Sequence, residues 1–259
     1  MNFKVLFSTM KVQMKQSFAR PMFRFCLLVN PVVNTILLYE MYRNSGSDNF
    51  MAYVVLGAGL MALWGCICFS SAGDINRERY SGTLALIYAA PAGFPAIILG
   101  KIIGNTLMSL VTLCISLITA VVLFRVPLHL ENPLLFLVAL LSAIVTFITI
   151  SSVIACLLTL SRKTELYMNC LEIPIILLCG FVFPVSVLPN AVQFASRLLS
   201  PTYAVELLRM SVNGCEDPAL FREKLLMLFL LTLIYAVLSA FLYKKIDRRV
   251  RIAATLEVS

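Results

Sequence analysis

Eight cysteines and one histidine are the residues of this chain that could bind a metal ion. A metal site needs several such ligands at suitable spacing, typically two cysteines separated by two residues. Cys66 and Cys68 are separated by a single residue, and His129 is distant from both in the sequence. Seven of the cysteines lie in strongly apolar stretches, where cysteine behaves as a small hydrophobic residue. We therefore predict no metal site in this chain.

The pair Gly100-Lys101 is the only Gly-Lys pair and could in principle belong to a phosphate-binding loop. Such a loop requires a glycine five residues before the Gly-Lys pair and a serine or threonine after the lysine. Pro95 and Ile102 occupy these two positions. We therefore predict that the chain does not cradle a nucleotide and has no catalytic site of its own.

The composition indicates which kind of secondary-structure element must hold any functional residue in place. Only 13% of the 259 residues are charged and 60% are hydrophobic, with a mean hydropathy of +0.92, which excludes an ordinary soluble enzyme. The charged residues leave six long uncharged windows, most of them long enough to cross a bilayer core about 30 Å thick. These windows are 25–39, 49–73, 102–124, 132–161, 173–196 and 225–243. We therefore predict an all-α membrane protein with six transmembrane helices.

The distribution of positive charge predicts the orientation of these helices. Fifteen of the 21 basic residues fall in the N-terminal segment, the loops 74–101 and 162–165, and the C-terminal tail. Short loops rich in Lys and Arg stay on the cytoplasmic side, so both termini are predicted to be cytoplasmic. Within a single domain, 1–259, residues 1–22 are predicted to form a cytoplasmic interfacial helix, with a frayed basic tail as the alternative. Residues 244–259 are predicted to be a basic cytoplasmic tail.

Polar residues inside the predicted spans are candidates for a translocation path. Asn105, Ser109, Thr112 and Ser116 are spaced to lie on one face of a helix. Such a seam either joins helices through hydrogen bonds or contacts a substrate, and both interpretations stay open. Glu172 is a further path candidate if it lies inside the fifth span, whereas it is interfacial if that span begins near residue 173.

The loop 74–101 combines charged and apolar residues in a way that suits a contact with a partner. Charges are dense at its start, Gly82 provides a flexible break, and Pro91 ends any helix that follows. Apolar residues such as Leu84 lie between these two breaks. We predict a short amphipathic helix parallel to the membrane that offers one face to a cytoplasmic partner; an ordinary charged loop is the alternative.

The end of the fifth window contains two prolines, Pro184 and Pro189, that interrupt a helix. The amphipathic stretches 190–200 and 202–213 that follow are too short to cross a membrane. We therefore predict spans one to five within 23–188, an extracytoplasmic re-entrant helix pair within 189–224, and span six at 225–243. Non-helical backbone at membrane depth has to be covered by protein.

Two stretches resemble the permease subunits of type-2 ATP-binding cassette (ABC) exporters. The coupling loop of that family runs Arg-Glu-Arg, Gly-Thr-Leu, Pro and Gly-Lys. The corresponding residues here are Arg77, Glu78, Arg79, Gly82, Thr83, Leu84, Pro91, Gly100 and Lys101. The segment with Pro184, Pro189, Pro201, Tyr203 and Arg209 resembles the re-entrant pair of the same family. The resemblance covers nearly the whole chain.

The resemblance implies a transport subunit in the plasma (bacterial cytoplasmic) membrane. Two permeases, identical or different, would surround the path, and each would dock a cytoplasmic subunit that binds ATP and magnesium. We expect outward movement of a drug, peptide or lipid-like amphiphile, with export of a polysaccharide or glycolipid as the alternative. An ion-driven carrier would normally show internal repeats, and none is visible in this sequence. An intramembrane enzyme is a poor fit, because the single histidine lies in a predicted outer loop.

Overall fold

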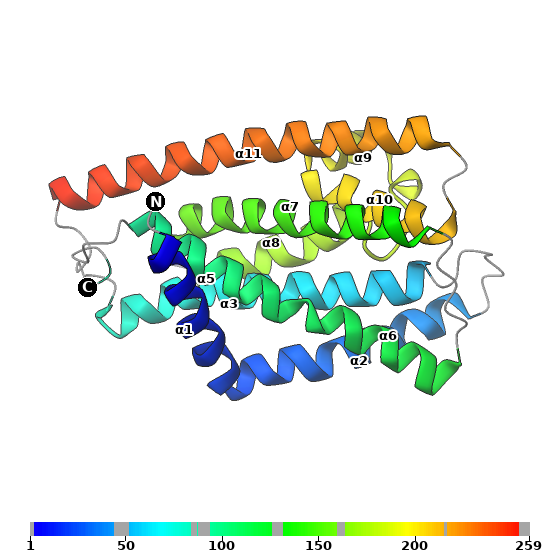
Figure 1. Cartoon of the computed structure of the whole chain (residues 1–259), viewed down its shortest axis with the longest axis horizontal. Coiled ribbons are helices and arrows are strands. Elements are labelled where there is room, and N and C mark those ends of the chain that lie inside the picture. Colours follow the sequence, from blue (N-terminus) through cyan, green and yellow to red (C-terminus); the bar gives the residue numbers. More distant parts are fainter. Residues whose placement is uncertain are drawn as a thin grey trace.

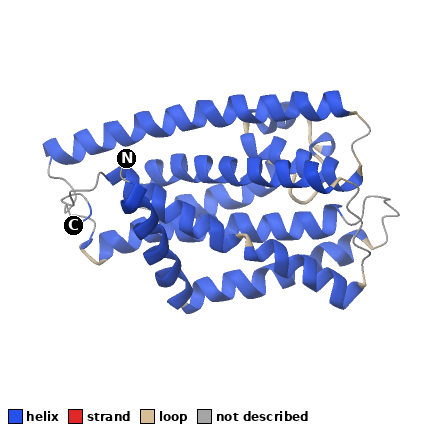
Figure 2. Cartoon of the chain, in the orientation of Figure 1, coloured by secondary structure: helices blue, strands red, loops and turns tan. Residues whose placement is uncertain are grey.

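The computed structural model describes residues 3–43, 52–83, 87, 94–125, 132–159, 164–214 and 217–253. Over these residues the chain is built of helices and contains no strand (Figure 2). The elements are α1 (Phe3–Ala19), α2 (Pro21–Tyr42), η1 (Ala52–Leu56), α3 (Gly57–Tyr80), α5 (Phe94–Ser109), α6 (Val111–Phe124), α7 (Pro133–Thr159), α8 (Thr164–Leu178), η2 (Val185–Val187), α9 (Asn190–Leu198), α10 (Ser200–Asn213) and α11 (Pro218–Ala253). The prediction of an all-helical chain is confirmed.

The long helices lie side by side in a bundle (Figure 1). Helix α1 crosses one end of the bundle at a steep angle, and the C-terminal end of α11 lies at this same end, on the left of the view. The short helices α9 and α10 lie toward the opposite end, beside the start of α11. We call the end that carries α1 the inner end and the other the outer end.

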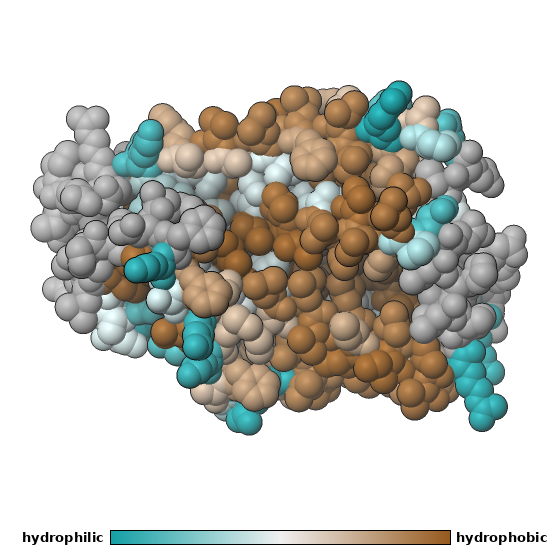
Figure 3. Space-filling model, viewed as in Figure 1, coloured by the Kyte–Doolittle hydropathy of each residue, from teal (hydrophilic) through white to brown (hydrophobic). Residues whose placement is uncertain are grey.

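Four helical segments are long and apolar enough to cross a membrane: Pro21–Tyr42, Pro95–Phe124, Pro133–Leu158 and Pro218–Ile246. They coincide with the first, third, fourth and sixth uncharged windows. A shorter apolar helix, Tyr53–Cys68, lies in the second window. A hydrophobic belt covers the middle of the visible surface, while hydrophilic side chains gather at its two ends (Figure 3). These features identify an integral membrane protein.

Two predicted boundaries differ from the structure. Helix α3 continues to Tyr80, so Asp74, Arg77 and Glu78 lie on its last turns instead of in a loop. No proline interrupts this stretch, and the helix ends just before Gly82, whose φ is +66°. The window 173–196 does not form one helix, because α8 ends at Leu178. The break therefore comes before Pro184, next to Gly180, whose φ is +72°.

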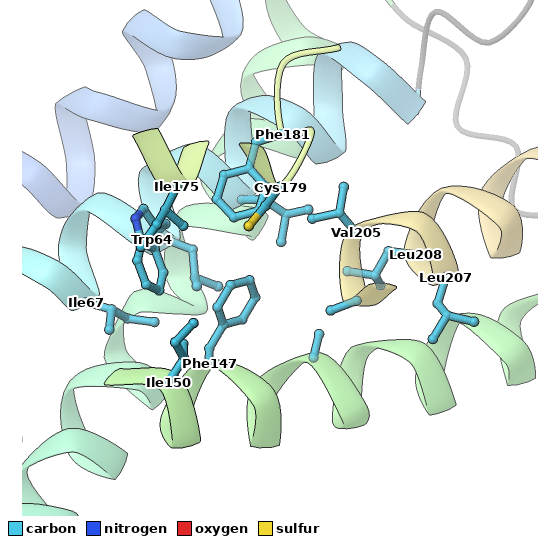
Figure 4. Close-up of a cluster of buried hydrophobic side chains, with 14 of the residues drawn as sticks. Trp64, Ile67, Phe147, Ile150, Ile175, Cys179, Phe181, Val205, Leu207 and Leu208 are labelled. Carbon is cyan, nitrogen blue, oxygen red and sulfur yellow. The ribbon is translucent and has the colours of Figure 1, made fainter. Parts of the chain in front are cut away.

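The main core lies where α3, α7, α8 and α10 meet (Figure 4). Trp64 of α3 packs beside Phe147 of α7, with ring centroids 6.0 Å apart. Phe147 also makes an edge contact with Phe181, which follows α8, at a centroid distance of 6.2 Å. All three side chains are almost completely buried. The outward face of α11, in contrast, exposes apolar residues such as Phe229, as expected of a helix in contact with lipid.

Candidate functional site

A buried polar cluster joins three helices at the inner end. Its members are Gln13, Ser17 and Arg20 of α1 or its end, Asp74 of α3 and Asn105 of α5, and we call it the Asp74 cluster. Asp74 is only 3% exposed. Its Oδ1 lies 2.6 Å from Nη1 of Arg20, and its Oδ2 accepts hydrogen bonds from the amides of Gln13 and Asn105, the latter at 3.0 Å. The carboxylate is thus satisfied mainly by partners from outside its own helix.

Two glycines of α5 allow α1 to pack directly on its backbone. A methyl group on Gly104 would lie 2.9 Å from the carbonyl oxygen of Met10, and one on Gly100 would lie 3.0 Å from that of Leu6. Both glycines are buried. Since the two positions are one helical turn apart, they form a smooth strip against which α1 rests. Close packing and the Asp74 cluster together fix α1 to the bundle.

Glu78 links the end of α3 to α5 and to the turn that follows. Its carboxylate pairs with Lys101 and accepts a hydrogen bond from the Thr83 hydroxyl. Burial by itself would raise the pKa of Glu78, but hydrogen bonds from Lys101 and Thr83, together with the charges of Lys101 and Arg77, hold the pKa below its ordinary value. Glu78 is therefore ionised at neutral pH and holds Lys101 in place.

The remaining predicted coupling residues surround an exposed tip. Arg77 is partly exposed, and its Nη1 lies 3.6 Å from Asp74 Oδ1. Burial and the charge of Arg20 lower the pKa of Arg77, while Asp74 opposes this effect. Tyr80 is 84% exposed, and Gly82 is also at the surface. Leu84 and the side chain of Arg79 lie outside the described part of the chain, as does most of the predicted amphipathic helix.

A cavity of about 390 Å³ opens beside this tip. It lies between the end of α1 and the last turns of α3, and Arg20, Asp74, Arg77, Glu78 and Thr83 are among the residues that line it. The cavity is therefore charged and lies next to the residues predicted to face a partner. Gln16 and Arg20 in its wall were not predicted as site residues, because nothing in their spacing links them to α3.

The polar seam faces neighbouring helices of the same chain. Asn105, Ser109, Thr112 and Ser116 are fully buried. Thr112 donates to the carbonyl oxygen of Gly59 at 3.3 Å, and Ser116 to that of Val55 at 3.1 Å. The Ser109 hydroxyl also donates to the carbonyl oxygen of Asn105, and the Thr112 hydroxyl donates to that of Ser109. These two bonds lie next to Leu110, where α5 ends and α6 begins. These bonds favour the packing interpretation of the seam.

Glu172 lies in the middle of α8 and is half-buried. A methyl group on Gly65 would lie 2.9 Å from its Oε1 and 3.9 Å from the amide nitrogen of Asn30. Among the described residues, this carboxylate forms no ion pair or hydrogen bond. Glu172 therefore differs from the seam residues, whose polar groups are satisfied inside the chain.

The outer end contains the predicted broken segment, and its free carbonyl groups have partners. Ser196 donates to the carbonyl oxygen of Leu178 at 2.5 Å, Arg209 to that of Phe181 at 2.9 Å, and Tyr42 to that of Val182 at 2.7 Å. Buried backbone groups that leave a helix need such partners, above all at membrane depth. The broken segment is therefore built into the protein.

The prolines of this segment stand at helix starts. Pro184 and Pro189 precede η2 and α9, and Pro201 lies in the first turn of α10, where its fixed φ suits a helix start. Tyr203 is partly buried in the same helix. The three prolines thus mark where these helices begin.

Arg209, the last residue of the predicted motif, is 7% exposed. Its guanidinium carbon lies 4.3 Å from the ring centroid of Tyr53, which stacks on Tyr42 at 5.6 Å. Neither tyrosine was predicted as a site residue. No local signal marks them, because Tyr53 reaches Arg209 through the packing of η1 against α10, and Tyr42 joins it through the packing of α2 against η1.

The family model described as ABC-2 type transporter matches residues 4–212, a range that runs from α1 almost to the end of α10. A search of curated proteins finds no match.

Proposed function

The chain belongs to the ABC-2 type transporter family and is a membrane-spanning permease component, and from this premise we propose that it is the export subunit of an ATP-driven transporter. Permeases of this family normally work with a cytoplasmic ATP-binding subunit and generally have no catalytic site of their own. ATP and magnesium would then be bound by the partner. The substrate would be a drug, peptide or lipid-like amphiphile that leaves the cell.

The proposed topology has six crossings with both termini in the cytoplasm. The position of α1 and of the C-terminal end of α11 at the same end of the bundle supports an even number of crossings. In this arrangement the inner end is cytoplasmic, and α1 lies in the cytoplasmic membrane interface. Helix α8 completes the fifth crossing together with the broken segment, and α9 and α10 are the re-entrant pair on the outer side.

The observation that carries the proposal is the mechanical link at the inner end. Glu78 ties the exposed tip of α3 to Lys101 of α5, and the Asp74 cluster ties α3 to α1. A displacement of the tip is therefore passed to three helices at once. ATP-driven closure of the partner would push on this tip, residues 77–83, and rock the spans, and hydrolysis would reset them. The charged cavity beside the tip offers space for a side chain of the partner.

Two permeases, identical or different, would form the path between them. Glu172 is the path residue that we retain, because its carboxylate forms no ion pair or hydrogen bond among the described residues. The seam from Asn105 to Ser116 would act mainly in packing. Export of a polysaccharide or glycolipid is the alternative within the same family, and an ion-driven carrier is a weaker one.

Coupling is tested by replacing Arg77, Glu78 and Arg79 together with alanine. The tagged chain is purified from its own cells with its ATP-binding partner, which mass analysis identifies, and is reconstituted in vesicles. We expect hydrolysis to continue while ATP-dependent transport is lost, because the tip no longer holds α5. The matched control removes the exposed pair Glu40 and Arg43 at the outer end, which lie 3.8 Å apart. Transport at the full rate by the correctly inserted triple variant would contradict the coupling role.

The orientation is tested by a cysteine at Ser81 and an impermeant thiol reagent added to intact cells. The background carries no Cys215, which lies in a predicted outer loop. A cysteine at Glu40, exposed at the other end of the bundle, serves as the positive control. We expect labelling at position 40 and none at position 81. Efficient labelling of position 81 from outside would contradict the topology.

A further inference from the structure

A second pocket, of about 470 Å³, lies at the outer end, and we call it the outer pocket. It is formed where η1, the turn at η2, α10 and the start of α11 meet. Its polar wall includes Tyr53, Ser186, Glu206, Arg209, Asn213 and Lys224. The coupling mechanism proposed above makes no use of this pocket.

The two acidic side chains of the outer pocket are already engaged. Glu206 Oε2 pairs with Lys224 Nζ at 2.7 Å. Asp217 Oδ1 accepts a hydrogen bond from the backbone N–H of Ala219 at 2.9 Å, at the start of α11. Neither carboxylate forms an ion pair with Arg209 in the described structure. Arg209 thus forms no ion pair with either carboxylate, although the charge of Glu206 still acts on it.

The Arg209 guanidinium is built into the wall of the pocket. Its side chain is 7% exposed and is held by the Phe181 carbonyl and the Tyr53 ring. Its Nε is buried and has no hydrogen-bond partner. A buried guanidinium that forms no ion pair and leaves one of its donors unpartnered is stabilised when an anion completes the site. A planar guanidinium matches the oxygens of a phosphate or carboxylate group especially well.

The remaining surroundings fit an amphiphile. Met210 and Leu220 supply an apolar part of the pocket wall. Leu220 is 41% exposed, and farther along α11 Leu226 is 64% exposed, on a helix whose apolar face lies in the hydrophobic belt. An acyl chain can therefore lie along α11 while its charged end enters the pocket.

We propose that the outer pocket binds the singly charged oxyanion of an amphiphile, such as a phosphodiester or carboxylate, on Arg209. Of the two cations in the pocket wall, Lys224 is paired with Glu206, which leaves Arg209 to receive a single negative charge. This inference rests on the proposed export function in one respect only: the bound amphiphile is the exported substrate at its point of exit. The chemistry of the site follows from the pocket itself.

Native mass spectrometry of the purified full-length chain in detergent tests the proposal. The probes are phosphatidylglycerol, which carries a single phosphodiester charge, and phosphatidylcholine, which has no net charge. We expect the unmodified chain to retain phosphatidylglycerol about tenfold more strongly. Arg209→Gln should lose this preference, because glutamine carries no charge. Arg222→Gln makes the same change in charge at an exposed residue outside the pocket and should keep the preference.

A second variant removes the dependence on how well Arg209→Gln folds. Ser186→Trp fills the rim of the pocket from an exposed position and leaves Arg209 intact, and it should also abolish the preference. An unchanged preference in either variant would overturn the proposal. Inorganic phosphate is added as a competitor to identify the source of the anion. We expect inorganic phosphate to displace little lipid. Full displacement would overturn the proposal that the ligand is an amphiphile, because the pocket would then bind a free anion.

The binding experiment uses no ATP-binding partner, so the two hypotheses fail separately. Loss of anion selectivity would leave the coupling experiment on residues 77–79 unaffected. A failure of coupling would leave the selectivity of the outer pocket unaffected.

Discussion

Removal of the Asp74 carboxylate tests whether α1 is fixed to the bundle as the structure shows. The change Asp74→Ala removes the acceptor of the Arg20 guanidinium and of the Asn105 amide, and one of the acceptors of the Gln13 amide. All of these donors come from outside α3, so the substitution removes the contact that joins α3 to α1 and α5.

The expected loss of folding stability follows from the burial of the Asp74–Arg20 ion pair. Removing one partner of a fully buried ion pair costs about 3–5 kcal/mol, because the other charge stays uncompensated. Asp74 is almost fully buried, but the Arg20 side chain is 21% exposed and can partly rehydrate. We therefore expect a loss near the lower limit, about 3 kcal/mol. At about 2–4 °C per kcal/mol for a domain of 150–250 residues, the melting temperature should fall by about 6–12 °C.

Thermal unfolding in detergent with a thiol-reactive dye measures this change. Cys66 and Cys156 are completely buried and become reactive only on unfolding. The exposed Cys114 and Cys170 are first blocked with an unlabelled reagent. The control Glu40→Ala removes a carboxylate that is 58% exposed, and such surface pairs contribute at most about 1 kcal/mol. A melting temperature of Asp74→Ala within about 2 °C of the unmodified chain, or no lower than that of the control, would contradict the role of Asp74 in fixing α1.

Three further outcomes follow from the same structure. The pKa of Glu78 in the folded chain lies below its ordinary value of 4.5, so the stability that Glu78 contributes is complete above pH 4.5 and is lost as the pH falls through the folded pKa. In thermal scans at a series of pH values, the melting temperature of Glu78→Gln should therefore depend less on acid than that of the unmodified chain. Gly104→Leu should lower the free energy of unfolding by about 1–3 kcal/mol and make α1 accessible to limited proteolysis. The control Gly73→Ala, whose nearest new contact would be at 3.8 Å, should not lower the melting temperature. Phe147→Ala should cost about 3–5 kcal/mol in denaturant unfolding, against little for Phe229→Ala, which is 52% exposed; equal losses would contradict the core assignment.

The sequence predicted the helices better than their ends. The first, third, fourth and sixth uncharged windows correspond to helices long enough to cross a membrane, since each is a continuous apolar run. The limits of α3 and α8 were missed. Charged residues do not end a helix, so α3 extends to Tyr80, and Gly180 adopts a positive φ before the prolines that the sequence analysis emphasised.

The candidate sites were predicted in part. Glu78, Thr83 and Arg209 were selected from the sequence, and the structure places them in contacts between elements. Arg20 and Tyr53, which complete those surroundings, were missed. Their neighbours lie far away along the chain, as Arg20 and Asp74 are 54 positions apart. No periodicity within one helix reports a contact of that kind.

The sequence by itself determined that this chain is helical and lies in a membrane. Both properties follow from local chemistry: long apolar runs avoid water, and in lipid their backbone groups must bond within each helix. Only the tertiary structure decided which polar groups meet, and hence that Asp74 is satisfied by α1 and α5 while Arg209 keeps an unpartnered donor in a pocket. Electrostatic and hydrogen-bond energies depend on distances of a few ångströms between residues that are remote in the chain, and these distances exist only once the helices have packed.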